Sequence, residues 1–338
     1  MSNPTPSDVH VNRPLTNVSV AYMQDPAGFV ADRLFPNIPS KNQGNVYFKY
    51  DRSDQWRDQF RKRAPGAPST CGGCKMTTDS FFCEKWSLHK LVTEEDIANA
   101  DEPLNLETDA AAWLGEQAMI SREVNFAANF LATGAWTGIN GSVGDMQGTT
   151  SSPNGNEFVQ WDQSTSTPIE DVKAQADAIW LLTSKRPNKL AIGRQVWTKL
   201  SDHPDLVDRI KYSSTNSVPA IVARQAAAAL FEVEELMVMD GINVTSDENP
   251  DFETSKTSAS IAGKKALLCY AAPRANTKEV SAGYTFSWNG LLGASAQGMR
   301  VKRWWDNDTS SWKIEGDMAY TQKRVCPDAA VLFFDVIA

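Results

Sequence analysis

The sequence predicts an α+β protein with more than one packed unit, and three observations indicate this fold class. Apolar residues recur at helical spacing over residues 104–132, which gives a helix of about seven turns. Two strand-like stretches, 45–51 and 79–92, flank a connection longer than the roughly 15 residues usual in a compact domain. Helices and strands alternate between residues 185 and 292, and only strands follow. The 338 residues also exceed one typical hydrophobic core.

The composition is that of a globular protein, with 41% hydrophobic and 22% charged residues. A formal net charge of −8 argues against a nucleic-acid binder that depends on many phosphate contacts. No apolar run approaches the roughly 20 residues that span a bilayer, and the N-terminal MSNPTPSDVHVNRP lacks the apolar core of a signal peptide. We therefore expect a protein made and kept in a cytosol, without membrane association. Its five cysteines do not form a secreted disulfide framework.

Residues 1–44 are predicted to form an N-terminal arm. About the first 20 residues are polar and proline-bearing, so they are expected to be extended and to lack a core of their own. A short helix is expected at Pro26–Leu34, and the turn-rich segment 35–39 follows it.

Residues 45–92 are predicted to form an extended loop, a β-hairpin arm that leaves the body. Asn45–Asp51 is a strand by its β-branched and aromatic content, and 79–92 is a second strand with imperfect alternation. The connection between them contains prolines and glycines. An isolated two-stranded arm is marginal in water, so this arm is expected to lie on a neighbouring subunit.

Residues 93–184 are predicted to contain a spine helix at 104–132 and a glycine-rich loop. Acidic residues at the helix start suit the helix dipole, and Thr133-Gly134 ends the pattern. The apolar face comprises Leu106, Ala110, Trp113, Ala118, Val124, Ala127 and Leu131, and it is widened by Met119, Phe126 and Phe130. Such a wide face needs cover from more than one side, so a separate sheet is expected against it. The alternative is the longest core helix of an enzyme.

The rest of the chain is predicted to be an α/β unit at 185–292 and terminal strands at 293–338. In the preceding loop, 134–167, a short strand is possible at 157–161, and Pro168–Thr183 is an amphipathic helix with proline in its first turn. The expected strands are 189–192, 233–239, 265–271, 284–288, 299–305, 312–323 and 329–337, and the expected helices are 195–200, 205–211 and 218–230.

The common catalytic motifs are absent from the sequence. It contains no G-x-x-x-x-G-K-[ST], no G-x-S-x-G and no H-E-x-x-H. The only histidines are His10, His89 and His203, and none has a sequence context typical of a general base. We therefore expect no enzymatic activity, no catalytic residue and no cofactor.

Cys71 and Cys74 form a C-x2-C motif, which is the most specific candidate for a metal or redox site in the sequence. With Cys83 and His89 they give C-x2-C-x8-C-x5-H, which has the ligand types of a zinc site. A dithiol redox site is a weaker alternative, because the motif does not open a helix in a βαβ unit. Cys83 and His89 would be about 20 Å apart on an extended strand. This separation favours a glycine-rich turn with free thiols and no metal.

Several stretches, in this order, resemble the major capsid proteins of tailed bacteriophages, whose shell fold is named after phage Hong Kong 97. They are NVSVAYMQDPAGFVADRLFPNIPSKNQGNVYFKYDR, KRPNKLAIGRQVWTKLSDHPDLVDRIKY, LFEVEELMVMDG, SAGYTFSWNG and TQKRVCPDAAVLFFDVI. The resemblance implies an N-terminal arm (1–44), an extended loop (45–92) and a peripheral domain (93–184). It also implies an axial domain (185–292) that faces the capsomer centre, and C-terminal strands (293–338) that return to the peripheral domain.

The same resemblance implies a function and a set of partners. Copies of the chain would self-assemble into hexamers and pentamers of an icosahedral shell around double-stranded DNA, bound without sequence specificity. A portal, a separate scaffolding protein and a decoration or cement protein are implied partners, and the location is the virion after assembly in the host cytoplasm. Many relatives carry a fused scaffolding segment, and only a short arm precedes the hairpin here. The alternatives are separate scaffolding, a removed prosegment or assembly without scaffolding.

Two other functions remain open from the sequence alone. One is a cellular nanocompartment shell of the encapsulin type, and the other is a cytosolic hydrolase or transferase built on residues 185–288. The family also cross-links a lysine with an asparagine, but no local motif assigns such a pair in this chain.

Charge is distributed unevenly between the hairpin and the start of the spine helix. Residues 50–75 carry six bases and three acids, whereas residues 94–116 carry eight acids and no base. Complementary potentials fix register between partners. We hypothesise an inter-subunit contact between basic and acidic side chains, namely Arg57, Arg61, Lys62 and Arg63 of one subunit and Glu94, Glu95 and Asp96 of the next. The alternative is that the acids serve their own helix dipole and the bases form a solvated tip.

Overall fold

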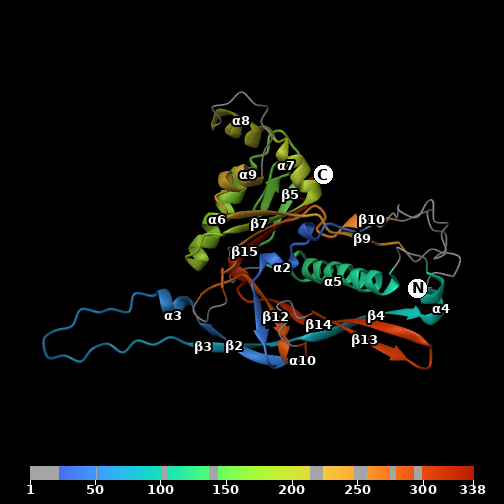
Figure 1. Ribbon diagram of the computed structural model, residues 1–338. Helices are drawn as coiled ribbons and strands as arrows, with labels where there is room; N and C mark the ends of the chain where they lie inside the picture. Colours follow the sequence, from blue (N-terminus) through green and yellow to red (C-terminus); the bar gives the residue numbers. More distant parts are fainter. Residues whose placement is uncertain are drawn as a thin grey trace.

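The structure is a computed structural model that describes residues 23–50, 52–100, 105–136, 144–213, 224–246, 257–274, 279–292 and 299–338. Figure 1 shows an α/β unit above a second sheet, with the long helix α5 between them and an arm that projects from one side. The arm predicted for residues 1 to about 20 lies outside the described residues.

The helices are α2 (Ala31–Leu34), α3 (Arg52–Trp56), α4 (Glu94–Asn99), α5 (Leu106–Phe130), α6 (Pro168–Thr183), α7 (Arg194–Ser201), α8 (Pro204–Ser213), α9 (Arg224–Leu230) and α10 (Asn289–Leu292). The first strands are β1 (Asn37–Ser40), β2 (Gly44–Tyr50), β3 (Met76–Phe82), β4 (Glu84–Thr93), β5 (Met146–Thr149), β6 (Glu157–Val159), β7 (Lys189–Gly193) and β8 (Glu235–Met239). The later strands are β9 (Ile242–Val244), β10 (Ser258–Ser260), β11 (Ala266–Cys269), β12 (Gly283–Trp288), β13 (Met299–Asp306), β14 (Ser311–Arg324) and β15 (Ala330–Phe334).

The predicted spine helix is confirmed as α5, which spans 25 residues. Asn105 caps its start by accepting a hydrogen bond from the Thr108 N–H at 3.1 Å. The chain leaves the helix through Gly134, whose φ of +79° is a left-handed conformation that suits glycine. At the C-terminal end Phe126 and Phe130 are fully buried and pack on Phe35, with ring centroids 6.2 and 4.8 Å away. These aromatic contacts join α5 to the segment that precedes β1.

The upper sheet has six strands in the order β6-β5-β15-β11-β7-β8. Its central strands are buried on both faces, so alternate residues enter two different cores. Leu190 and Leu268 pack with α6 to α9 on one face, whereas Ala191 and Leu267 pack with α2 and the end of α5 on the other. Figure 1 shows α6, α7, α8 and α9 grouped on the side of this sheet that faces away from α5.

The lower sheet has five strands, in the order β1-β12-β14-β13 with β4 on the other side of β14. Strand β14, of 14 residues, pairs with three neighbours and is the centre of this sheet. One face carries α5, where Ala110 and Leu114 pack on Val92 and Ile314. A two-stranded ribbon, β2 with β3, continues from this sheet toward the projecting arm (Figure 1).

The prediction of one strand over residues 79–92 is wrong. The chain pairs with β2 as far as Phe82 and then changes partner, because β4 pairs with β14. Cys83 is the junction: its N–H donates to the Gln43 carbonyl at 2.8 Å and its side chain is fully buried. Only β2 and β3 therefore belong to the projecting ribbon, and β4 belongs to the body.

The predicted domain limits do not coincide with the two sheets. Within residues 93–184, β5 and β6 enter the upper sheet, and β12 of residues 185–292 lies in the lower one. The terminal strands also separate, since β13 and β14 join the lower sheet and β15 lies between β5 and β11 in the upper one. The first four residues of β15 are buried, so a central position covers both of its faces.

Several short elements escaped prediction. Strand β1 lies in the segment 35–39 expected to be turn-rich, and it is an edge strand, where Pro39 is tolerated. Strands β5, β9 and β10 and helices α3, α4 and α10 also escaped prediction. The helix expected at 218–230 is described from Arg224 onward as α9. Among the described helices, none is both long and apolar enough to cross a membrane.

Candidate functional site

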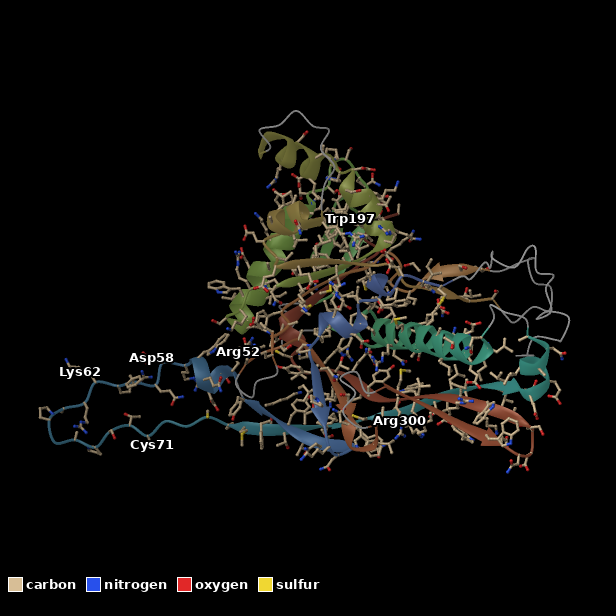
Figure 2. The ribbon with its side chains drawn as sticks, viewed as in Figure 1. Arg52, Asp58, Lys62, Cys71, Trp197 and Arg300 are labelled. Carbon is tan, nitrogen blue, oxygen red and sulfur yellow. The ribbon has the colours of Figure 1, made fainter. Side chains whose placement is uncertain are left out.

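The projecting arm is the most unusual feature of the described chain. It leaves the ribbon after Tyr50 and returns at Met76, and beyond α3 it has no regular secondary structure (Figure 2). At its root Arg52 donates to the Leu182 carbonyl at 2.9 Å, at the end of α6. The two limbs of the arm are joined because the Lys75 N–H donates to the Asp54 carboxylate at 3.1 Å. The arm is therefore fixed at its root and extends away from its own subunit.

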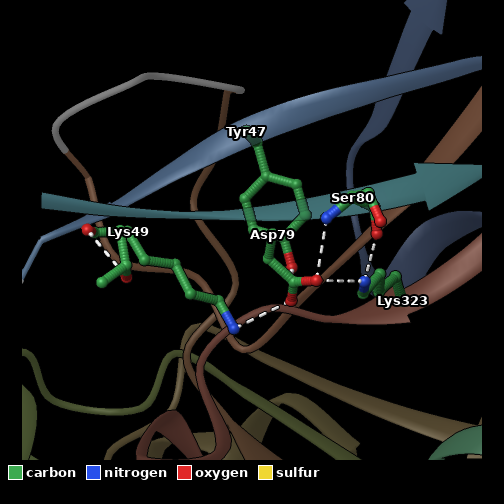
Figure 3. Close-up of polar contacts among 6 residues, drawn as sticks. Tyr47, Lys49, Asp79, Ser80 and Lys323 are labelled. Atoms are coloured by element: carbon green, nitrogen blue, oxygen red, sulfur yellow. Dashed lines mark hydrogen bonds and ion pairs between the residues drawn. The ribbon is translucent and has the colours of Figure 1, made fainter.

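A polar cluster fastens the ribbon to the lower sheet (Figure 3). The Asp79 carboxylate accepts hydrogen bonds from the Tyr47 hydroxyl at 2.8 Å, from Lys323 of β14 at 2.9 Å and from the Ser80 N–H at 2.8 Å. It also pairs with Lys49 at 3.0 Å. Burial raises the pKa of Asp79, but the hydrogen bonds from Lys323, Lys49, Tyr47 and Ser80 outweigh burial and hold the pKa well below its usual range.

The two faces of the ribbon differ, because side chains alternate along a strand. On the inner face the Phe81 ring stacks on Phe286 with centroids 4.0 Å apart. On the outer face five large apolar side chains are between 42% and 61% exposed, namely Val46, Phe48, Tyr50, Met76 and Phe82. An apolar stripe of this size is typical of an interaction surface.

The predicted basic and acidic contact residues lie at opposite ends of the subunit. Arg57, Arg61, Lys62 and Arg63 are all exposed on the arm, whose outer part carries Lys62 in Figure 2. Helix α4, with the predicted acids, lies at the far end of the molecule (Figure 1). The arm cannot reach α4 of its own subunit, so the hypothesis of a contact between copies stays a prediction.

The acids themselves are not equivalent. Glu94 and Glu95 are exposed in the first turn of α4, where they also suit the helix dipole. Asp96 is only 7% exposed, and its N–H donates to the Thr93 side chain at 3.1 Å in the N-cap. Its burial removes Asp96 from the set that a neighbour can contact, and Glu94 and Glu95 remain.

The structure contradicts the four-ligand zinc hypothesis. Cys71 and Cys74 are exposed on the arm, whereas Cys83 is fully buried at the junction of β3 and β4. His89 lies on β4, opposite Glu315 of β14. Within the described part of the chain, which includes all four residues, no group of three or more such side chains could hold a metal ion.

His203 has a structural role. It is buried, its Nδ1 accepts a hydrogen bond from the Asp205 N–H at 3.2 Å, and its Nε2 lies 3.0 Å from the Ser166 Oγ. Because Nδ1 is an acceptor, Nε2 carries the proton and donates it. The Ser166 hydroxyl donates to the Gln163 carbonyl at 2.8 Å. This histidine therefore cannot accept the serine proton as a general base would. His10 lies outside the described residues.

A buried carboxylate on α5 binds the start of the described chain. The helical pattern of the sequence did not reveal it. Glu123 is 1% exposed and accepts hydrogen bonds from the N–H groups of Val30 at 3.0 Å and Ala31 at 2.8 Å. Burial raises the pKa of Glu123 to about 7, although these two hydrogen bonds lower it; the Asp32 carboxylate also raises it. Glu123 thereby joins α5 to α2.

A second buried carboxylate lies in the lower sheet. Asp317 of β14 has no exposed surface, and three cations surround it: Lys302 at 2.6 Å, Lys85 at 3.2 Å and Arg300 at 3.2 Å. The Ser87 hydroxyl also donates to it at 2.7 Å. Burial raises the pKa of Asp317, but the hydrogen bonds from these groups prevail and hold the pKa well below its usual range. The cluster ties β4, β13 and β14 together.

Comparison with known proteins identifies the architecture. The major capsid protein of Burkholderia phage BcepMu is 24% identical over 234 residues, which cover 68% of each chain. A phage-related protein of Bordetella bronchiseptica has a similar structure, with 19% identity, a TM-score of 0.64 and coverage of 93% of this chain and 94% of its own. This chain is a tailed-phage major capsid protein with the Hong Kong 97-like fold. The capsid of cyanophage P-SCSP1u shares the fold at 11% identity, with a TM-score of 0.60 and coverage of 98% and 94%.

The capsid family and fold expected from the sequence are thus confirmed, and the chain is a structural subunit of a virion shell without enzymatic activity. No protein-family model matches the sequence. A holo-encapsulin complex from Synechococcus elongatus also shares the fold, with 11% identity, a TM-score of 0.56 and coverage of 100% of this chain and 98% of its own. The fold alone does not separate phage shells from encapsulins. The sequence relatives are phage capsid proteins, and they favour the phage shell.

Proposed function

We propose that this capsid protein assembles hexamers and pentamers that close an icosahedral shell around double-stranded DNA. The observation that carries the proposal is the arm, which is fixed at its root by Arg52 and directed away from its own body. Such an arm supports a heterologous contact, in which one surface of a subunit binds a different surface of the next, and contacts of this kind close into rings.

We assign the upper α/β unit to the axial domain that faces the capsomer centre. The lower sheet and α5 then form the peripheral domain, and the ribbon with its arm is the extended loop. This spatial assignment replaces the limits expected from the sequence, because β5, β6, α6 and β15 pack with the upper unit and β12 with the lower sheet.

The arm of one subunit lies over the acidic region of the next, with Arg57, Arg61, Lys62 and Arg63 near Glu94 and Glu95. Single exposed ion pairs contribute only about 0–1 kcal/mol. The contact repeats around every ring, so small terms add up in an assembled particle. Complementary charge also suppresses wrong registers between subunits.

The DNA is packaged without sequence recognition, and the net charge of −8 suits a container that must release it. A portal, a separate scaffolding protein and a decoration or cement protein are the further partners we propose. An encapsulin-like role would instead give particles with a protein cargo, so nuclease-protected DNA in purified particles separates the two functions.

Charge reversal tests the proposed arm contact. Replacement of Arg61, Lys62 and Arg63 by glutamate should block assembly and leave the subunit folded, as measured by electron microscopy and circular dichroism. Basic substitutions at Glu94 and Glu95 in the same chain should restore partial assembly, and they serve as the matched control. Normal shells from the reversed arm would contradict the contact.

A further inference from the structure

We propose that Phe60 of one subunit inserts into an apolar groove between α5 and β4 of a second copy of this chain. The inference rests on the proposed function and deepens it, because it names the surface on which the arm of a neighbour docks.

Phe60 is an exposed aromatic side chain on the arm. Its exposed fraction is 94%, the largest among the exposed large apolar residues of the described chain. The arm around it is extended, and the labelled Asp58 and Lys62 lie well away from the body in Figure 2. Burial of a phenyl ring is favourable because it removes a large apolar surface from water. The described residues of its own subunit leave this ring exposed, so burial of the ring requires a partner.

The groove has the size and the lining of a site for one aromatic ring. It has a volume of about 170 Å³, and its apolar lining comes from Trp86 and Leu88 of β4, Leu114 and Ala118 of α5, and Met318 of β14. Ser87, Gln117, Ser121 and Gly316 complete the lining, so the rim also carries polar groups. An apolar cavity of about 150 Å³ binds benzene in other proteins. Trp86 and Leu88 are 40% and 42% exposed, so the groove is open to a side chain from outside.

Charges beside the groove have the same spacing as charges beside Phe60. Arg57 precedes Phe60 by about 10 Å at 3.3 Å per residue, and Glu84 precedes the midpoint of Trp86 and Leu88 by the same distance along β4. Glu84 shares the α5 face of β4 with these two residues, because side chains alternate. With the ring in the groove, the backbone of Arg57 lies level with Glu84, although its side chain leaves the opposite face of an extended arm and must turn back to reach Glu84. Arg57 then lies about 30 Å from Glu94, so only Arg61, Lys62 and Arg63 of the proposed bases can approach Glu94 and Glu95.

The same arrangement reaches the acids of α4. From the same midpoint Glu94 lies about 23 Å along the chain, and Arg63 lies about 10 Å beyond Phe60. The side chains of Arg63 and Glu94 must therefore span the remaining distance of about 13 Å. The arm thus runs parallel to β4, with its bases directed toward Glu94. The single base on this face of β4 is Lys90, whose ammonium group lies 5.5 Å from the Trp113 ring centroid.

The occupant is a second copy, because the geometry separates the arm and the groove within one subunit. The arm projects from one end of the lower sheet, whereas β4 runs toward the other end (Figure 1). Among the described strands β4 pairs with β14 alone, so its other edge is open beside the groove. A capsid protein presents many identical copies to one another, and a groove-and-key contact between different surfaces suits their rings.

Disulfide trapping tests this contact in assembled particles. The parent carries Cys71→Ser and Cys74→Ser, which remove the two exposed thiols. Phe60→Cys with Leu88→Cys should give covalent subunit ladders on non-reducing gels. The matched control combines Phe60→Cys with His89→Cys. Residue 89 is next to Leu88 but lies on the opposite face of β4, because neighbouring side chains alternate along a strand. The control should therefore give about tenfold less cross-linked product or lower. Equal cross-linking in the two, or none with Leu88→Cys, overturns the proposal.

A second measurement does not depend on the cysteines. Phe60→Ala and Ala118→Leu, which fills the groove, should each reduce the yield of shells by at least about tenfold, because each prevents burial of the ring. The combination should cost no more than either change alone. The contact is overturned if the double variant loses shell yield by the product of the two single losses, or if Phe60→Ala gives a normal yield of shells. Electron microscopy of the parent tests the proposed function separately: a parent without shells contradicts that function, whereas shells without the Leu88 cross-link contradict the groove contact alone.

Discussion

Replacement of Glu123 by glutamine should stabilise the subunit at alkaline pH and change little at acidic pH. The carboxylate is 1% exposed, and its pKa rises from 4.5 to about 7, chiefly because of burial. The folded state binds the proton more tightly than the unfolded state. The corresponding stability is therefore fully present below about pH 4.5 and is lost as the pH rises through about 7. The ion pair of Arg122 with Asp32 lies beside this site at 2.8 Å and remains in the variant.

The magnitude follows from the size of the shift. A rise of about 2.5 pKa units at 1.36 kcal/mol per unit gives a cost of about 3 kcal/mol for the ionised form above pH 7. Glutamine keeps an oxygen that accepts from the Val30 and Ala31 N–H groups, but it carries no charge. Because neutral hydrogen bonds are weaker than charge-assisted ones, about 3 kcal/mol is the upper limit of the gain.

Urea unfolding of the dissociated subunit between pH 5 and pH 8 measures this effect. The free energy of unfolding of Glu123→Gln should exceed that of the unmodified chain at pH 8, and the difference should fall below about 1 kcal/mol at pH 5. Glu170→Gln is the control of opposite sign, because the Arg209 hydrogen bond outweighs burial and lowers the pKa of Glu170. Equal free energies of unfolding of the two chains at pH 8, or a difference that is the same at pH 5 as at pH 8, would show that the Glu123 carboxylate does not destabilise the folded state when it ionises.

Three further outcomes are expected. Deletion of residues 1–20 should leave a folded subunit that assembles poorly by electron microscopy, and normal shells at normal yield would show that this arm is not an assembly element. Replacement of Cys71 and Cys74 by serine should leave assembly and thermal unfolding unchanged, whereas stoichiometric zinc, lost in this variant, would contradict a metal-free turn. Asp317→Asn should lower the free energy of unfolding by about 3 kcal/mol or more, because it leaves three cations beside a neutral group; a smaller loss by urea titration would show that Lys302 and its neighbours relax into solvent.

The long elements could be predicted from the sequence because local chemistry defines their ends. Helix α6 begins and ends as predicted, with Pro168 in its first turn and Ser184 in a left-handed conformation after its last residue. The ends of α5 fall within two residues of the prediction, because Asn105 caps its start. Strand β1 could not be predicted in the same way. Its Pro39 favours a turn unless the strand lies at a sheet edge, and only the tertiary fold supplies that edge.

Prediction of the functional surfaces was less complete, because it depends on which side chains are buried and a sequence does not show this. The arm bases and the acids of α4 were visible as charge, yet Asp96 is buried and Glu94 is exposed in the same turn. The buried carboxylates Glu123 and Asp317 look like ordinary charged residues in the sequence, because their partners come from distant segments. The break at Cys83 likewise has no local signal, since it reflects a change of strand partner.

Cryo-electron microscopy of particles assembled from the purified chain is the decisive test of shell formation and of the arm contact. We expect closed shells of hexamers and pentamers, in which the arm of each subunit lies on its neighbour with Arg61, Lys62 and Arg63 beside Glu94 and Glu95. A chain that forms no shell would contradict it. So would a shell in which these bases lie more than about 16 Å, roughly two Debye lengths at physiological salt, from the carboxylates of any neighbour in this region.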